Sequence, residues 1–260
     1  MERKLLSFIF LSLPVLIVAQ WRLASKIDLP QTPSTYATDV GGNLYVGYKD
    51  GSLVKYNSQG EELLNFSLSN QSPISLIEPQ FQLKTFLFYF DNQVITILDR
   101  FNTLPKNYPV REYTNGIVSM ACPAPDGTFW MVENNPSVLK RVDPIRLSTI
   151  LETQPSLGSE IKQMKAYQNF LLILDEVGLR LFDQYGSQIF EINKDISSFV
   201  IQNDQLFCLS EAEILEIDMS EGKVKATQEA PEQAMDAYLP NDDTSFFLQG
   251  STLYIFEAGD

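Results

Sequence analysis

Histidine is missing from all 260 residues of this chain, and cysteine and tryptophan occur only twice each. Without histidine the chain lacks the commonest general base and the commonest ligand of transition metals. A Ser–His–Asp catalytic arrangement is therefore excluded. The sequence also contains no glycine-rich phosphate-binding loop. These absences argue against the common hydrolytic and metal-dependent chemistries, and we expect a protein that is not an enzyme and needs no cofactor.

Basic residues are scarce as well. The chain has 19 lysines and arginines against 33 aspartates and glutamates, which gives a formal net charge of −14. Such a chain repels nucleic acid and anionic lipid headgroups, so both are poor candidates for a partner. Basic proteins or cations are favoured instead.

The two cysteines, Cys122 and Cys208, each lie within an apolar pattern typical of a buried strand. An exported protein could join them in a disulfide. The apolar surroundings favour two buried free thiols.

The first 19 residues have the pattern of a secretory signal peptide. A charged lead, Glu2-Arg3-Lys4, precedes an apolar stretch from Leu5 to Val18. This stretch is too short to span a bilayer as a helix, and no later segment could do so. We expect cleavage near Ala19-Gln20, no membrane-spanning segment, and one domain over residues 20–260 that is periplasmic or secreted.

The rest of the chain repeats. An apolar strand that ends in Asp, Asn or Glu before a turn recurs six times, and successive copies end 35 to 44 residues apart. A period near 40 residues with four strands in each unit indicates a β-propeller, in which every unit is one blade. The six copies are Val54–Asn57, Ile95–Asp99, Leu139–Asp143, Leu179–Asp183, Ile214–Asp218 and Leu253–Glu257.

The pattern predicts an all-β fold: a six-bladed β-propeller closed by the N-terminal strand. The sixth unit has no fourth strand of its own, whereas Trp21–Leu29 is a spare strand ahead of the first unit. Pairing the two would close the ring and remove an open sheet edge. The expected inner strands are Thr35–Val40, Ile74–Glu78, Ile117–Cys122, Ile161–Ala166, Ser197–Gln202 and Ala234–Leu239.

The repeat resembles the short propeller repeats of two-component-regulator, NHL and PQQ-like type. Gly42–Asn57 and Asp126–Val132 carry the resemblance. It implies a propeller that serves as a recognition platform, since only a minority of such propellers are enzymes. An acidic propeller behind a signal peptide is also similar to periplasmic accessory subunits of outer-membrane assembly or secretion machinery, including the type 9 apparatus. That similarity implies a protein partner in the cell envelope.

Two features suggest where such a partner would bind. The corner between the second and third strands carries a carboxylate in five blades, at Asp50, Asp91, Glu133, Asp175 with Glu176, and Glu211 with Glu213. Together these acids would form a ring at one end of the propeller channel, unless they are ordinary solvated turn residues. The connection Arg100–Pro109 is unusually apolar and aromatic, with Phe101 and Tyr108 as candidate contacts, unless it folds onto its own blade.

Two other functions remain open. A calcium-dependent hydrolase or lactonase could use carboxylates at the inner strands, at Asp39, Glu78 and Asp236. A glycan-binding propeller is the third class. Asp126–Trp130 matches part of an aspartate box, but Ala124 replaces its leading serine, and we interpret the segment as a structural turn.

Overall fold

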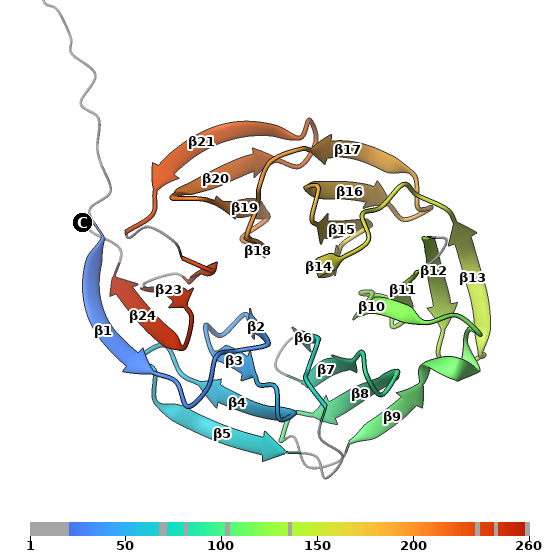
Figure 1. The fold of residues 1–260 in the computed structure, drawn as a ribbon, viewed down its shortest axis with the longest axis horizontal. Helices are drawn as coiled ribbons and strands as arrows, with labels where there is room; N and C mark the ends of the chain where they lie inside the picture. The colour runs from blue at the N-terminus through green and yellow to red at the C-terminus, as the bar shows by residue number, and fades with distance from the viewer. Residues whose placement is uncertain are drawn as a thin grey trace, which may run out of the picture.

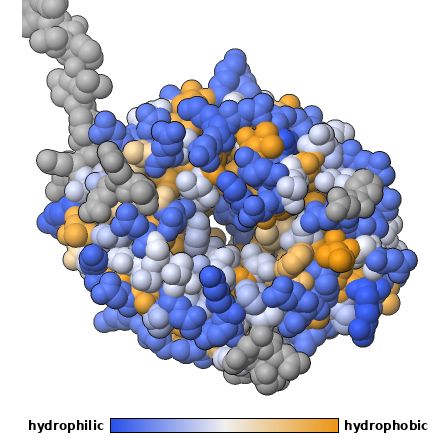
Figure 2. Space-filling model, viewed as in Figure 1, coloured by the Kyte–Doolittle hydropathy of each residue, from blue (hydrophilic) through white to orange (hydrophobic). Residues whose placement is uncertain are grey.

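The computed structural model describes residues 21–67, 72–80, 83–101, 105–134, 137–231, 235–241 and 244–257. In these residues the chain forms six antiparallel four-stranded sheets, arranged as blades in a ring (Figure 1). The space-filling view shows a central channel in this ring (Figure 2). The predicted six-bladed β-propeller is therefore confirmed. The predicted signal peptide lies outside the described residues. No helix within them is long and apolar enough to cross a membrane.

The strands follow one another from the channel outward in each blade. Blade 1 contains β2 (Thr35–Thr38), β3 (Leu44–Gly47), β4 (Ser52–Tyr56) and β5 (Glu62–Ser67). Blade 2 contains β6 (Leu76–Gln80), β7 (Lys84–Tyr89), β8 (Val94–Asp99) and β9 (Lys106–Pro109), followed by a short 3₁₀ turn at Val110–Glu112. Blade 3 contains β10 (Val118–Pro123), β11 (Phe129–Glu133), β12 (Val138–Asp143) and β13 (Ser148–Thr153).

The second half of the ring repeats this order. Blade 4 contains β14 (Ile161–Tyr167), β15 (Phe170–Asp175), β16 (Leu179–Asp183) and β17 (Gln188–Ile192). Blade 5 contains β18 (Ser198–Gln202), β19 (Gln205–Ser210), β20 (Glu213–Asp218) and β21 (Lys223–Glu229). Blade 6 contains β22 (Ala237–Pro240), β23 (Thr244–Gln249), β24 (Thr252–Glu257) and, as its outer strand, β1 (Arg22–Asp28).

The core lies between neighbouring blades, where the second strands are buried on both faces. Residues 86–88 of β7 and 171–174 of β15 have no exposed surface. A strand covered on both sides reads as a continuous apolar run, as these segments do. Packing between blades therefore supplies the apolar burial that stabilises the ring.

Turns between the third and fourth strands are fixed by a short polar side chain. The Asn57 Oδ1 atom accepts hydrogen bonds from the backbone N–H groups of Gln59 (3.0 Å) and Glu61 (2.8 Å). Gly60 then takes a φ of +82°, and a Cβ there would lie 2.0 Å from the Ile27 side chain. The positive φ favours glycine at this position, and a side chain there would also have to displace the end of Ile27.

Paired amide contacts join some blades to the inner strand of the next blade. The Gln163 side chain in blade 4 donates to the Phe199 carbonyl (2.8 Å) and accepts from the Phe199 N–H (2.9 Å) in blade 5. Gln93 in blade 2 makes the same pair of bonds with Val118 in blade 3 (2.9 and 2.8 Å). Each side-chain amide takes the place of a strand residue, because it offers one donor and one acceptor side by side.

The predicted closure of the ring is confirmed. β1 pairs antiparallel with β24 from Arg22↔Glu257 to Asp28↔Thr252. Beside this strand, the Trp21 indole packs edge-on against Phe247, with ring centroids 5.2 Å apart. The Trp21 Nε1–H donates to the Glu229 carbonyl of blade 5 (2.9 Å). The N-terminal segment therefore completes blade 6 and also ties it to the preceding blade.

The propeller has two faces that differ in their turns. The turns between first and second strands lie at one end of the channel, together with those between third and fourth strands in blades 1 to 5; we call this the mouth face. The turns between second and third strands and the connections between blades lie at the other end, which we call the corner face. Figure 2 shows the ring hollowed at its centre.

We predict that Trp21→Ala destabilises the protein far more than a change on the adjoining strand β1. Loss of the indole removes its packing on three aromatic rings and one inter-blade hydrogen bond. The free energy of unfolding should fall by about 3 kcal/mol, measured by urea unfolding followed by circular dichroism. Leu23→Ala is the matched control, because Leu23 is 48% exposed. Equal effects of the two changes would contradict closure through Trp21.

Candidate functional site

The acidic corner residues share the corner face, but they do not form one exposed ring. Asp50, Asp91, Glu176 and Glu211 are exposed. The Asp50 carboxylate accepts hydrogen bonds from Ser52 Oγ (2.6 Å) and from the side-chain amide of Gln31 (3.0 Å). Hydrogen bonds from the backbone N–H groups of Glu160 and Ser159 hold the pKa of Glu176 at about 2. Asp50 and Glu176 therefore stabilise their turns through hydrogen bonds to neighbouring residues.

Glu133 and Asp175 are buried, in contrast to the expectation of exposed charge. Glu133 is 8% exposed, and its carboxylate pairs with Lys140 Nζ at 2.6 Å. Asp175 is 1% exposed and is paired with Arg180, which also contacts Glu191 at 2.8 Å. The Asp175 carboxylate further accepts from the Gly158 N–H (2.7 Å) of the connection into its blade. Both carboxylates hold the connections into their blades, because the Thr114 hydroxyl donates to Glu133 and the Gly158 N–H donates to Asp175.

The two aromatic candidates of the blade 2 loop differ. Phe101 is 58% exposed, with the Arg100 guanidinium 4.5 Å from the centre of its ring. Tyr108 is half-buried and packs edge-on against Phe129 of blade 3, with ring centroids 5.5 Å apart. Tyr108 lies on β9, so the end of the predicted connection is the outer strand of blade 2 rather than a loop. Phe101 is the candidate that stays accessible. Residues 102–104 lie outside the described residues.

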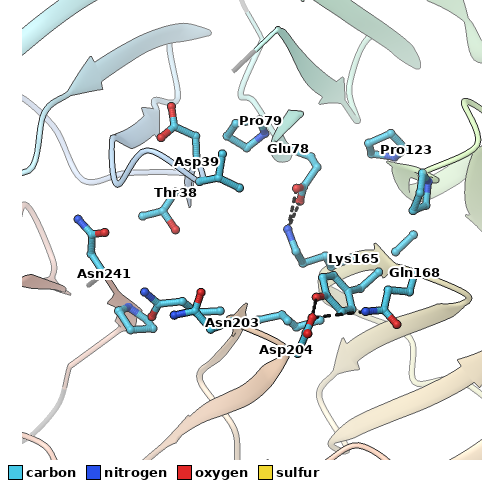
Figure 3. Close-up of a pocket in the computed structure, with 17 residues that line it drawn as sticks. Thr38, Asp39, Glu78, Pro79, Pro123, Lys165, Gln168, Asn203, Asp204 and Asn241 are labelled. Atoms are coloured by element: carbon cyan, nitrogen blue, oxygen red, sulfur yellow. Dashed lines mark hydrogen bonds and ion pairs between the residues drawn. The ribbon is translucent and has the colours of Figure 1, made fainter. Parts of the chain in front are cut away.

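A cavity of about 640 Å³ opens at the mouth face, and sequence reasoning did not identify it. All six blades contribute to its lining (Figure 3). One part of the wall is polar and carries Gln168, Asn203, Asp204 and Asn241 from blades 4 to 6. The part from blades 2 and 3 carries Pro79, Pro123 and Pro125. Each blade contributes only a few residues, in or beside the turn between its first and second strands. No single stretch of sequence therefore indicates the site.

An ion pair crosses the channel at the floor of this cavity. Lys165 Nζ of β14 lies 2.6 Å from Glu78 Oε1 and 2.7 Å from Oε2 of β6 (Figure 3). The two side chains are 22% and 18% exposed. Beyond them the channel narrows to a space of about 60 Å³ lined by residues 35–38 and 162–165, among others. The pair therefore separates the mouth cavity from the corner end of the channel.

The polar wall is shaped by a tight hairpin turn. Asn203 and Asp204 both have positive φ, at 49° and 62°. Asparagine and aspartate tolerate this conformation, which two-residue hairpins of the I′ type require. The Tyr167 hydroxyl donates to the Asp204 carboxylate, and this bond raises the pKa of Tyr167. The Asp204 side chain is therefore held at the cavity rim by a neutral group.

The carboxylates considered for calcium are occupied by groups of the chain itself. Asp39 accepts from the Asn43 amide (3.0 Å) and pairs with Lys55 (3.2 Å). Burial alone would raise the pKa of Asp39, but the Asn43 hydrogen bonds and the Lys55 charge outweigh burial and lower it. Asp236 accepts from the Gly250 N–H (2.6 Å). Among the described residues, no three acidic or cysteine side chains are grouped so that they could hold a metal ion.

Both cysteines are buried free thiols, as the sequence predicts. Burial raises the pKa of Cys208 to about 12, and burial also raises that of Cys122, helped by the nearby Glu78 charge. A thiol is nucleophilic only as its thiolate. Neither cysteine therefore offers a reactive group at neutral pH.

The Asp126–Trp130 segment is a structural turn. Asp126 Oδ1 accepts from Thr128 Oγ1 (2.7 Å), and Asp126 Oδ2 pairs with Arg141 (2.5 Å). The Arg141 guanidinium lies over the Trp130 ring, 5.4 Å from its centre. These contacts fold the turn onto its own blade.

Comparisons with known proteins identify the fold alone. No family model and no curated protein sequence matches this chain. The β-propeller domain of Cps50 (Swd1) from Myceliophteria thermophila has 10% identity and a TM-score of 0.66, covering 92% of this chain and 100% of that one. Virginiamycin B lyase from Staphylococcus aureus has 13% identity and a TM-score of 0.65, covering 92% and 99%. A chain of the mitotic checkpoint complex has 10% identity and a TM-score of 0.63, covering 100% of both.

We predict that the channel ion pair is energetically coupled. In a double-mutant cycle, Glu78→Gln and Lys165→Met should each lower the free energy of unfolding. The loss in the double variant should be about 1 kcal/mol smaller than the sum of the two single losses. Unfolding free energies from chemical denaturation measure this. The exposed pair Lys223–Glu221, at 2.8 Å, is the matched control and should show no measurable coupling. Additive effects at Glu78 and Lys165 would show that the pair does not form in solution.

Proposed function

We propose that this chain is a non-catalytic, exported β-propeller that binds another protein through its mouth face. The observation that carries this proposal is the distribution of exposed apolar side chains. Fourteen large apolar residues are exposed among the described residues. Six of them lie on mouth-face turns, namely Val40, Leu83, Phe101, Ile145, Leu147 and Tyr185.

The rest of the surface is less apolar at its turns. Only Phe90, Ile117 and Val177 are exposed among the described turns and connections of the corner face, and the remaining five lie on the outer strands. Single exposed apolar residues are ordinary, but their gathering on one face suits protein contact. The mouth-face residues come from blades 1 to 4, and Ile145 reaches 87% exposure. A partner that covers this face would bury several of them together.

The structural neighbours support protein binding more than catalysis. One of them is a chain of the mitotic checkpoint complex and therefore belongs to a protein assembly. Another is a lyase, and a histidine-to-alanine variant of it is described as catalytically inactive. This chain has no histidine at any position, so it cannot use that residue type for chemistry.

Export to the cell envelope belongs to the same proposal. It is supported by the apolar stretch from Leu5 to Val18 behind a charged lead. The expected partner is an envelope or outer-membrane protein, and the resemblance to accessory subunits of secretion machinery supports a scaffold role there. Intact-mass measurement of the native protein should show a chain that begins near Gln20. A mass that retains the first 19 residues would overturn export.

The binding face is tested by substitution on two surfaces. Leu83→Ser, Phe101→Ser and Ile145→Ser together remove apolar area from the mouth face. The matched control, Leu63→Ser, Ile150→Ser and Ile189→Ser, removes it from outer strands of blades 1, 3 and 4. Each tagged protein is purified from cell envelopes under native conditions, and co-purifying chains are quantified.

We expect the control to retain its partner and the mouth-face variant to recover at least about tenfold less, because loss of several central contacts weakens an interface strongly. Circular dichroism and thermal melting verify that both variants fold. Equal recovery by the two variants would place the interface elsewhere. Absence of any stoichiometric partner with the unaltered chain would contradict the proposed function itself.

A further inference from the structure

We propose that the mouth cavity binds a short, extended, net-basic peptide segment of the partner. This inference rests on the proposed protein-binding function and names what the centre of the mouth face recognises. The apolar turns around the cavity would contact the folded body of the partner. The cavity itself would take one segment that projects from that body.

The size of the cavity limits its occupant. At about 640 Å³ it falls within the range of pockets that hold small ligands. A folded surface cannot enter such a space, whereas a few residues of extended chain can. The Glu78–Lys165 pair forms the floor and stops the segment from threading through the channel.

The polar wall suits a peptide backbone. Every peptide unit carries one donor and one acceptor, and a side-chain amide offers both groups in a fixed plane. Gln168, Asn203 and Asn241 bring three such amides to the lining, each from a different blade. Within the chain, Gln168 Nε2 donates to Asp204 (3.4 Å) and Asn241 Nδ2 donates to the Gly42 carbonyl (3.4 Å), so a guest would exchange such bonds for its own. An extended segment that crosses the cavity would pass these amides in turn.

The proline part of the wall favours recognition by side chains. Pro79, at the end of β6, and Pro123, at the end of β10, have no N–H to offer. The guest therefore cannot extend these strands by regular backbone pairing there. Their rings instead supply apolar surface against which the side chains of the guest can pack.

Charge selects a basic guest. The Glu78 and Lys165 charges neutralise each other, and Asp39 at the lining is paired with Lys55. Asp204 is exposed and held by the neutral Tyr167 hydroxyl, so that bond leaves its negative charge in place at the rim. The whole chain also carries a net charge of −14. Both the local and the overall potential attract lysine or arginine side chains.

The test uses defined peptides as the probe. Short synthetic peptides are arrayed, capped at both ends and graded in composition from acidic to basic. The array is incubated with the labelled, purified protein. Three proteins are compared: the unaltered chain, Asp204→Asn, and Asp91→Asn. The two variants lose the same charge from exposed positions on opposite faces. Asparagine tolerates the positive φ of residue 204, so the hairpin should keep its shape.

We expect binding to rise with peptide basicity and to weaken as salt increases. Asp204→Asn should weaken binding of the basic peptides about threefold, and Asp91→Asn should leave it unchanged. A second variant, Val40→Trp, places a large ring at the cavity rim, where Val40 is 79% exposed. It should reduce binding of all retained peptides without lowering thermal stability.

Several results would overturn the inference: binding independent of peptide charge, equal losses in Asp204→Asn and Asp91→Asn, or full binding by Val40→Trp. Retention on a glycan array together with none on the peptide array would assign the cavity to saccharides and would overturn it too. If partner recovery still depends on Leu83, Phe101 and Ile145 in these cases, the protein-binding function stands and only the peptide site falls.

Discussion

The pairing of β1 with β24 holds the two ends of the chain in one sheet, and the ring depends on it. Without β1, blade 6 would expose an unpaired edge and lose the Trp21 contacts to Phe247 and to blade 5. The mouth cavity takes residues from all six blades, so its shape exists only in the closed ring. The pairing of β1 with β24 at the outer edge of the ring therefore determines whether the mouth cavity forms at its centre.

Within the closed ring, the inner strands are tied to one another by polar contacts. Gln163 joins blades 4 and 5, and the Glu78–Lys165 pair links blade 2 to blade 4 across the channel. These contacts occupy polar groups that would otherwise line an open channel. The mouth cavity above them has a polar wall and a proline wall, and blades 1 to 4 place exposed apolar turns on the same face. We propose that this arrangement recognises a protein partner.

The fold was predictable because its signals are local and repeated. The strand that ends in Asp, Asn or Glu recurs in every blade, and Trp21–Leu29 is visibly a strand without a partner. The site was not predictable in this way, because the burial of a side chain depends on which residues the neighbouring strands place beside it. Glu133 and Asp175 read as exposed corners, yet Lys140 and Arg180 on the following strands pair with them. In each pair the base follows the acid by five or seven residues across a hairpin, and this spacing could have predicted a buried ion pair. Asp204 and Glu78 share a cavity although they lie in blades 5 and 2.

We propose that the mouth face is the recognition surface. Hydrogen–deuterium exchange of the full chain, alone and bound to its co-purified envelope partner, tests this most directly. We expect slower exchange in the bound state at the mouth-face turns around residues 166–170 and 202–205. We expect no change at the corner turns around residues 49–52 and 90–93. Protection confined to those corner turns would contradict the proposal.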